Sequence, residues 1–145
     1  MTLTGQTLRG RWRVGPKLGE GACASVYEVE DLREGSAMKF VVKCSPLPVG
    51  GKKSANYKAM LNAYNTLYYE YTLYNGHLAQ FKYRPSHPEV DFYGEDKGVR
   101  YIVIQRLKED LSHIAKRTQV TREWLADVGM QILEGMEMLH SKGIP

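Results

Sequence analysis

A loop near the start of the chain, LGEGACAS at residues 18–25, holds two closely spaced glycines, Gly19 and Gly21. Glycine has no Cβ, so the backbone of such a loop can approach a phosphate group closely. Residues 25–31 follow the glycines and read as a β-strand, whereas a dinucleotide-binding loop opens a helix. The spacing therefore indicates a glycine hairpin between two strands and disfavours a dinucleotide-binding loop.

A lysine that could meet a phosphate lies on the next predicted strand, residues 37–44, in the sequence FVVK. Strand alternation places Lys43 on the same face as Val41 and on the opposite face from Val42. Lys39 shares the face of Lys43 but lies nearer the turn, so we favour Lys43. A lysine that ends an apolar strand can also simply extend to solvent.

A carboxylate partner for Lys43 is indicated by the same part of the chain. A charge held away from water is costly unless an opposite charge pairs with it. Between Glu34 and Glu89 the sequence has a single acidic residue, Glu70, in the middle of a predicted helix that runs from residue 55 to about residue 78. Most helix glutamates are solvated, but Glu70 is surrounded by tyrosines and leucines. We predict a Lys43–Glu70 ion pair.

The elements that must position these residues follow from the hydrophobic pattern. Strands are predicted at residues 12–18, 25–31, 37–44, 90–93 and 99–105, and helices at 55–78, 107–116 and 122–141. Residues 1–9 read as a polar lead-in, and the loop at 46–56 has no assigned role. The order of these elements, three strands followed by a helix, two strands and further helices, predicts an α+β domain with an antiparallel meander.

Composition limits the classes of protein that the chain can belong to. Its 145 residues are 43% hydrophobic and 25% charged, which suits one globular domain with its own core. The net charge of +4 comes without a long basic stripe, so nucleic-acid binding is not predicted. Two cysteines, no secretory signal and no apolar run of about 18 residues predict an intracellular protein without a membrane span.

Taken in order, these motifs resemble the N-terminal lobe of a eukaryotic protein kinase. The resemblance is carried by VVK at 41–43, LYYE at 67–70, FKY at 81–83 with YG at 93–94, DL at 110–111 and LHSKGI at 139–144. The casein kinase one group fits best, and its vaccinia-related kinase branch in particular. A kinase of another group, such as the mitotic checkpoint type with its own GEGA loop, remains an alternative.

The resemblance implies a fold and a division of the chain. The fold would be a protein-kinase-like α+β fold, with a five-stranded antiparallel N-lobe sheet, one long helix and the first helices of a truncated helical C-lobe. Residues 1–9 would be the lead-in, residues 10–107 the N-lobe with the glycine-rich loop and the hinge, and residues 108–145 the start of the C-lobe.

The resemblance also implies an ATP site. Its residues would be Leu18, Gly19, Gly21, Val26, Val41, Lys43, Glu70, Ile104, Gln105, Leu107 and Asp110. Lys43 would contact the α- and β-phosphates, and Glu70 would hold Lys43. Ile104 would be the gatekeeper, and the backbone of Gln105 and Leu107 would hydrogen-bond the adenine edge.

Some positions depart from the pattern or leave alternatives open. Asp110 would reach the ribose or cap the following helix. Ala24 stands where a third loop glycine is usual, and Cys23 stands where an aromatic residue is common. The catalytic loop and the D-F-G motif that binds Mg²⁺ would lie beyond Pro145, so the chain as given is expected to bind ATP without transferring phosphate.

The resemblance therefore implies the ATP-binding part of a serine/threonine protein kinase, which as a complete protein would phosphorylate a protein substrate with Mg²⁺. One alternative is a catalytically inactive, pseudokinase-like module that binds a nucleotide or a partner, and another is a structural α+β domain with an ordinary hairpin. Helix 122–141 carries an apolar stripe, which predicts self-association through an exposed face. The stripe consists of Leu125, Val128, Ile132, Met136 and Leu139.

Overall fold

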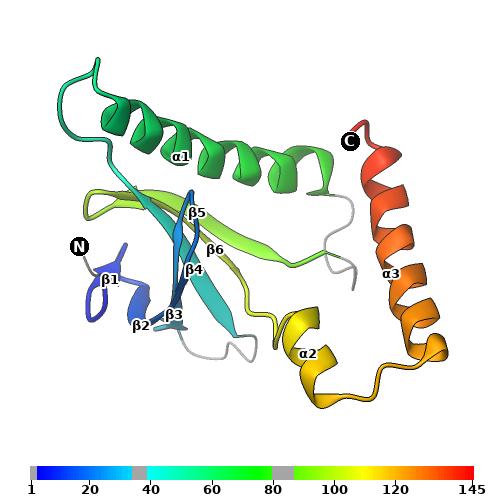
Figure 1. Ribbon diagram of the computed structural model, residues 1–145. Coiled ribbons are helices and arrows are strands. Elements are labelled where there is room, and N and C mark those ends of the chain that lie inside the picture. Colours follow the sequence, from blue (N-terminus) through cyan, green and yellow to red (C-terminus); the bar gives the residue numbers. More distant parts are fainter. Residues whose placement is uncertain (1–2, 34–38, 80–86) are drawn as a thin grey trace.

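The computed structural model describes residues 3–33, 39–79 and 87–145. Its main feature is an antiparallel sheet of six strands in the order β1-β2-β3-β4-β6-β5 (Figure 1). The strands are β1 (Thr7–Leu8), β2 (Trp12–Glu20), β3 (Ser25–Asp31), β4 (Phe40–Pro46), β5 (Val90–Asp96) and β6 (Val99–Gln105). The helices are α1 (Ala55–Thr72), its π-helical extension η1 (Leu73–His77), α2 (Leu111–Arg117) and α3 (Arg122–His140).

The apolar core lies on one face of this sheet. Tyr27, Val42 and Val103 are cross-strand neighbours on that face, and each is at most 2% exposed. The opposite face carries helix α1, so β6 is covered on both sides and Ile102 is also fully buried. The apolar centre of β6, residues 101–104, is typical of a strand that is buried on both faces.

The predicted kinase-like fold, with a five-stranded sheet and one long helix, was wrong. The sheet has a sixth strand, β1, and curls into a nearly closed, barrel-like shape, and α3 is as long a helix as α1. The guanidinium of Arg11, at the start of β2, lies 3.0 Å from a carboxylate oxygen of Asp91 on the edge strand β5. The backbone N–H of Arg9 donates to Asp96 at 2.9 Å. These contacts fasten the first strands to the last one.

Leu3 and Leu8, in the segment predicted as a polar lead-in, belong to the core. Leu3 is 2% exposed and Leu8 is fully buried, and β1 pairs with the start of β2. A strand of two residues has too few positions to show alternation, and two leucines separated by polar residues have no helical or strand period. The segment is therefore too short for its hydrophobic pattern to reveal a buried strand.

The other elements lie close to their predicted positions. Strands β3 and β6 have the predicted bounds, and β5 continues beyond the predicted residue 93 to Asp96. Helix α1 begins after Ser54, whose hydroxyl accepts the backbone N–H of Tyr57 at 3.1 Å and so caps the helix. Residues 34–38 and 80–86, which include the FKY motif and the first residues of the predicted strand 37–44, lie outside the described part of the chain.

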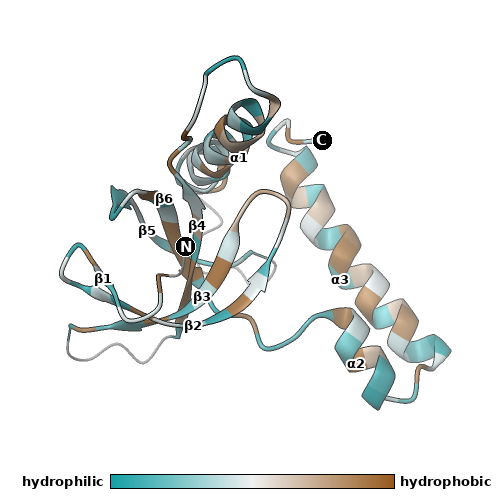
Figure 2. Ribbon diagram, turned by 60° about the vertical axis from the view of Figure 1, so that its left-hand side comes forward, coloured by the Kyte–Doolittle hydropathy of each residue, from teal (hydrophilic) through white to brown (hydrophobic). Residues whose placement is uncertain are grey.

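Helix α3 lies to one side of the sheet, and hydrophobic residues recur along its length (Figure 2). None of the described residues of α3 is buried. Its apolar stripe is open to solvent, with Leu125 56% exposed and Ile132 48% exposed. The exposed apolar face that the sequence predicted is therefore confirmed.

The two cysteines differ in accessibility, which leads to a simple prediction. Cys23 is exposed, whereas burial of the Cys44 thiol raises its pKa from 9.0 to about 11. The thiolate is the reactive form, so at pH 8 we expect one thiol per chain to react quickly with a disulfide reagent in the folded protein, and two in denaturant. Two fast thiols in the folded protein would contradict the placement of Cys44.

The same burial predicts how stability depends on pH. Because the folded state disfavours the Cys44 thiolate, its contribution to the free energy of unfolding is present below pH 9 and is lost as the pH rises toward about 11. Urea denaturation across this range measures the loss. Cys44→Ala is the control, in which this part of the pH dependence should disappear.

Candidate nucleotide-binding site

Lys43 and Glu70 form an ion pair between the sheet and helix α1. The ammonium Nζ of Lys43 donates to Oε2 of Glu70 at 2.8 Å, and the two side chains are 33% and 27% exposed. Lys43 points to the α1 side because Val42 and Cys44 take the core face of β4. The predicted ion pair is confirmed, whereas Lys39, the rival lysine, is exposed at the start of the strand.

The glycine hairpin lies in register with Lys43 across three strands. Gly19 on β2 pairs with Val26 on β3, and Val26 pairs with Lys43 on β4. Directly opposed residues point to the same face of a sheet, and neighbouring strands lie about 5 Å apart. The backbone of Gly19 is therefore about 10 Å from the backbone of Lys43. The Cα position of Gly19 opens toward the face on which the Lys43 ammonium group lies.

A small apolar surface adjoins Lys43 on this face. Val41, two residues before Lys43 on β4, pairs with Ile104 of β6 and is 9% exposed. Leu18, at the base of the hairpin, is 46% exposed. The arrangement brings together the predicted residues for a flat base and the predicted residues for the phosphates.

The residues predicted to contact the adenine edge and the ribose have other partners in this structure. The backbone N–H of Gln105 donates to the carbonyl of Glu89 at 2.7 Å and is therefore already occupied. Asp110 caps α2, because its carboxylate accepts the backbone N–H of His113 at 2.9 Å. That bond lowers the pKa of Asp110. Leu107 is 65% exposed and lies between these two residues in the chain.

The hairpin itself is a tight turn that faces α1 across a cleft. The backbone N–H of Gly21 donates to the carbonyl of Ala24 at 2.8 Å, which closes the turn. At the tip, the carbonyl of Cys23 accepts the hydroxyl of Ser45, a fully buried residue of β4. Ser45 was not predicted, although its spacing of two residues from Lys43 places it on the same face.

Arg100 and a group of tyrosines hold α1 in place over the sheet. The guanidinium of Arg100 lies 3.6 Å from the ring centroid of Tyr64 and donates to the Tyr64 carbonyl at 3.0 Å. Tyr71 on α1 stacks on Tyr93 of β5, with ring centroids 4.5 Å apart. These contacts fix the helix that carries Glu70, and the sequence showed them only as an unexplained excess of tyrosine.

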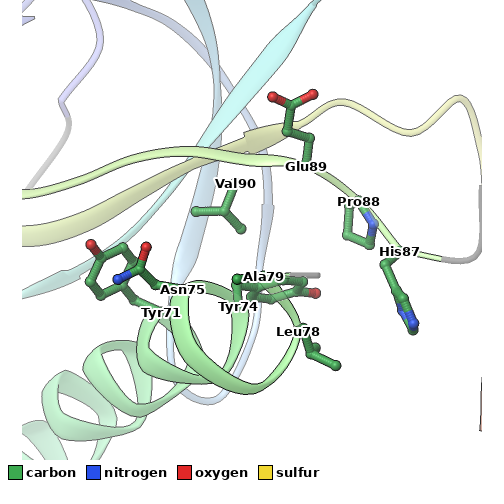
Figure 3. Close-up of a pocket in the computed structure, with 9 residues that line it drawn as sticks. All are labelled: Tyr71, Tyr74, Asn75, Leu78, Ala79, His87, Pro88, Glu89 and Val90. Carbon is green, nitrogen blue, oxygen red and sulfur yellow. The ribbon is translucent and has the colours of Figure 1, made fainter. Parts of the chain in front are cut away.

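A separate cavity of about 90 Å³ opens at the C-terminal end of α1 (Figure 3). Its walls come from the helix end and from the start of β5, with Tyr74 and Val90 among them. Burial and the nearby carboxylate of Glu70, four residues earlier, raise the pKa of Tyr74. The cavity was not predicted from the sequence.

Comparison with known proteins does not assign the chain to a family: no family model matches it, and no curated protein matches its sequence. Within the described residues, no helix is both long enough and apolar enough to span a membrane. The same residues contain no group of three or more His, Cys, Asp or Glu side chains placed to bind a metal ion.

Proposed function

We propose that the chain is the ATP-binding part of a serine/threonine protein kinase, with Lys43 as the ligand of the nucleotide phosphates. The observation that carries the proposal is the Lys43–Glu70 pair at 2.8 Å, in register with the glycine hairpin. A carboxylate that holds the ammonium group fixes its position, and partial exposure leaves it open to phosphate oxygens. The proposal rests on these residues and on the sequence motifs, not on the fold class.

The site offers the two kinds of surface that a nucleotide needs. The hairpin backbone and Lys43 face the phosphates, and the apolar side chains of Val26, Val41 and Ile104 face the base. The rows of Val41 and Lys43 are two residues apart on β4, or about 7 Å along the strand. An extended nucleotide can therefore lie along β4, with its base at the level of Val41 and its α-phosphate at the level of Lys43.

A thermal-shift titration with ATP tests the proposal. ATP should raise the melting temperature of the wild type, because a ligand at a hundredfold excess over its Kd stabilises the folded state by about 2.7 kcal/mol. Lys43→Met should lose this shift. Lys39→Met is the matched control, since Lys39 lies on the same strand side but is exposed, and it should keep the shift. An unchanged shift in Lys43→Met would exclude Lys43 as the phosphate ligand.

A second candidate function, a partner-binding module, is favoured by the open apolar stripe of α3. We propose that a second copy of the chain covers Leu125, Ile132 and Met136, which are 56%, 48% and 43% exposed. Light scattering should show oligomers of the wild type, and Ile132→Glu should shift the population toward the monomer because it places a charge in the contact. A monodisperse wild-type monomer would contradict this second candidate.

A further inference from the structure

Ser45 is a buried hydroxyl between two elements of the proposed site. It follows Lys43 by two residues on β4, shares its face and is fully buried. Its hydroxyl donates to the carbonyl of Cys23 at the hairpin tip. On the other side, the carbonyl of Ala63 in α1 lies 3.5 Å from the same hydroxyl oxygen. Ser45 therefore has one acceptor on the hairpin and one on the helix.

The two acceptors compete for a single hydrogen. A serine hydroxyl has one hydrogen to donate, so Ser45 satisfies one carbonyl at a time. A carbonyl oxygen has two lone pairs, so Ala63 can keep its helical hydrogen bond and still accept the hydroxyl. When the Ser45 hydroxyl shifts its hydrogen bond from the Cys23 carbonyl to the Ala63 carbonyl, the buried hydroxyl is never left unsatisfied, and that cost is avoided.

The space around this contact allows the hairpin tip to move. A cleft of about 210 Å³ separates the hairpin from α1, with Gly21, Cys23, Met60 and Ala63 among its walls. The hydrogen bond from Ser45 to the Cys23 carbonyl ties the hairpin tip to β4 beside this cleft. Ala63 and Glu70 lie two turns apart on one side of α1. A change at Ala63 can therefore reach Glu70 through the helix.

We propose that Ser45 is a positioning residue of the nucleotide site: it holds the hairpin tip against β4 through the Cys23 carbonyl and releases the tip by donating to the Ala63 carbonyl of α1 instead. The inference rests on the proposed function for the identity of the ligand. The coupling of hairpin and helix through Ser45 does not depend on which ligand binds. Nucleotide entry beneath the hairpin requires the released state, so Ser45 opposes binding.

Cys23 supplies a natural reporter for the test, because its exposed thiol lies at the hairpin tip. Ser45→Ala should raise the alkylation rate of Cys23 severalfold and should speed amide hydrogen exchange around Ala63. Ser25→Ala is the control, since its hydroxyl contacts Glu20 within the hairpin at 3.4 Å. It should leave exchange in α1 unchanged. An unchanged Cys23 rate, or unchanged exchange in α1, for Ser45→Ala would overturn the coupling.

A second variant keeps the test valid if Ser45→Ala does not fold. Ser45→Cys has nearly the size of serine but is a weak hydrogen-bond donor, so it should show the same faster reaction at Cys23. Alkylation is read from the mass of the peptide that contains residue 23, which separates it from the new thiol. A wild-type rate in a folded Ser45→Cys variant would also overturn the inference.

ATP titration separates this inference from the proposed function. If release of the tip precedes binding, Ser45→Ala should bind ATP about three- to tenfold more tightly than the wild type, which a loss of structure would not produce. Weaker or equal binding would overturn the role of Ser45 while leaving the function intact. If ATP binds neither protein but the faster Cys23 reaction and α1 exchange are seen, the proposed function fails and the coupling stands.

Discussion

Replacing Trp12 with alanine should lower the free energy of unfolding by about 3–5 kcal/mol. The indole is fully buried and packs edge-on against Phe40, with ring centroids 5.7 Å apart. Trp12 lies on β2 and Phe40 on β4, so the contact joins strands that have β3 between them. Domains of this size are stabilised by about 5–15 kcal/mol, and the variant should therefore be partly unfolded at moderate temperature.

Urea denaturation followed by far-UV circular dichroism measures this effect. Trp124→Ala is the control, because Trp124 lies on α3, where none of the described residues is buried, and its loss should cost less than about 1 kcal/mol. Trp12→Phe should fall in between: the indole N–H has no hydrogen-bond partner among the described residues, and phenylalanine removes this donor. Equal losses for the two alanine variants would show that Trp12 is not central to the core.

The strands and helices could largely be predicted because each has a clear local pattern. Strand β3 alternates between its faces, β6 has an apolar centre at residues 101–104, and α3 has apolar residues at helical spacing. Such patterns follow from the burial of one face or of both. They determine which residues form an element, but they carry little information about how far a sheet curls.

The curl of the sheet depends on features that local patterns do not show. The pairing of β2 with β3 shifts register twice, between Val14 and Lys17 and between Lys17 and Gly19. Such irregularities bend a strand and increase its twist. The contacts that then join the two ends of the sheet link residues 80 and 87 positions apart. A sequence without aligned relatives gives no sign of pairings at that distance.

The candidate site could be predicted where only one residue was able to balance a partly buried charge. Lys43 needed a carboxylate, and Glu70 was the sole acidic residue over a long stretch of the chain. Ser45, in contrast, acts through two backbone carbonyls, and the sequence does not mark which carbonyls approach a given hydroxyl. Asp110 was open to two interpretations, and the structure shows the helix cap. Local hydrogen bonds that compete with a ligand become visible only in three dimensions.

Replacing Arg11 with methionine should cost about 2–3 kcal/mol and loosen the closure of the sheet. The guanidinium lies 3.0 Å from carboxylate oxygens of both Asp31 and Asp91, and the Asp31 side chain is only 6% exposed. Methionine keeps much of the length of the side chain but leaves that carboxylate without its main partner. Arg11 also lies 3.9 Å from the ring centroid of Trp12, and this cation–π contact is lost as well.

Two measurements separate closure from general stability. Urea denaturation should show the loss in Arg11→Met, and amide hydrogen exchange should become faster around Asp91 on β5. Arg13→Met is the matched control: Arg13 pairs with Glu30 at 3.5 Å, but both side chains are more than half exposed, at 58% and 66%. Exposed pairs contribute about 0–1 kcal/mol, so this variant should stay near the wild type. If the two variants lose equal stability, or if exchange in β5 does not change, Arg11 does not hold the sheet closed.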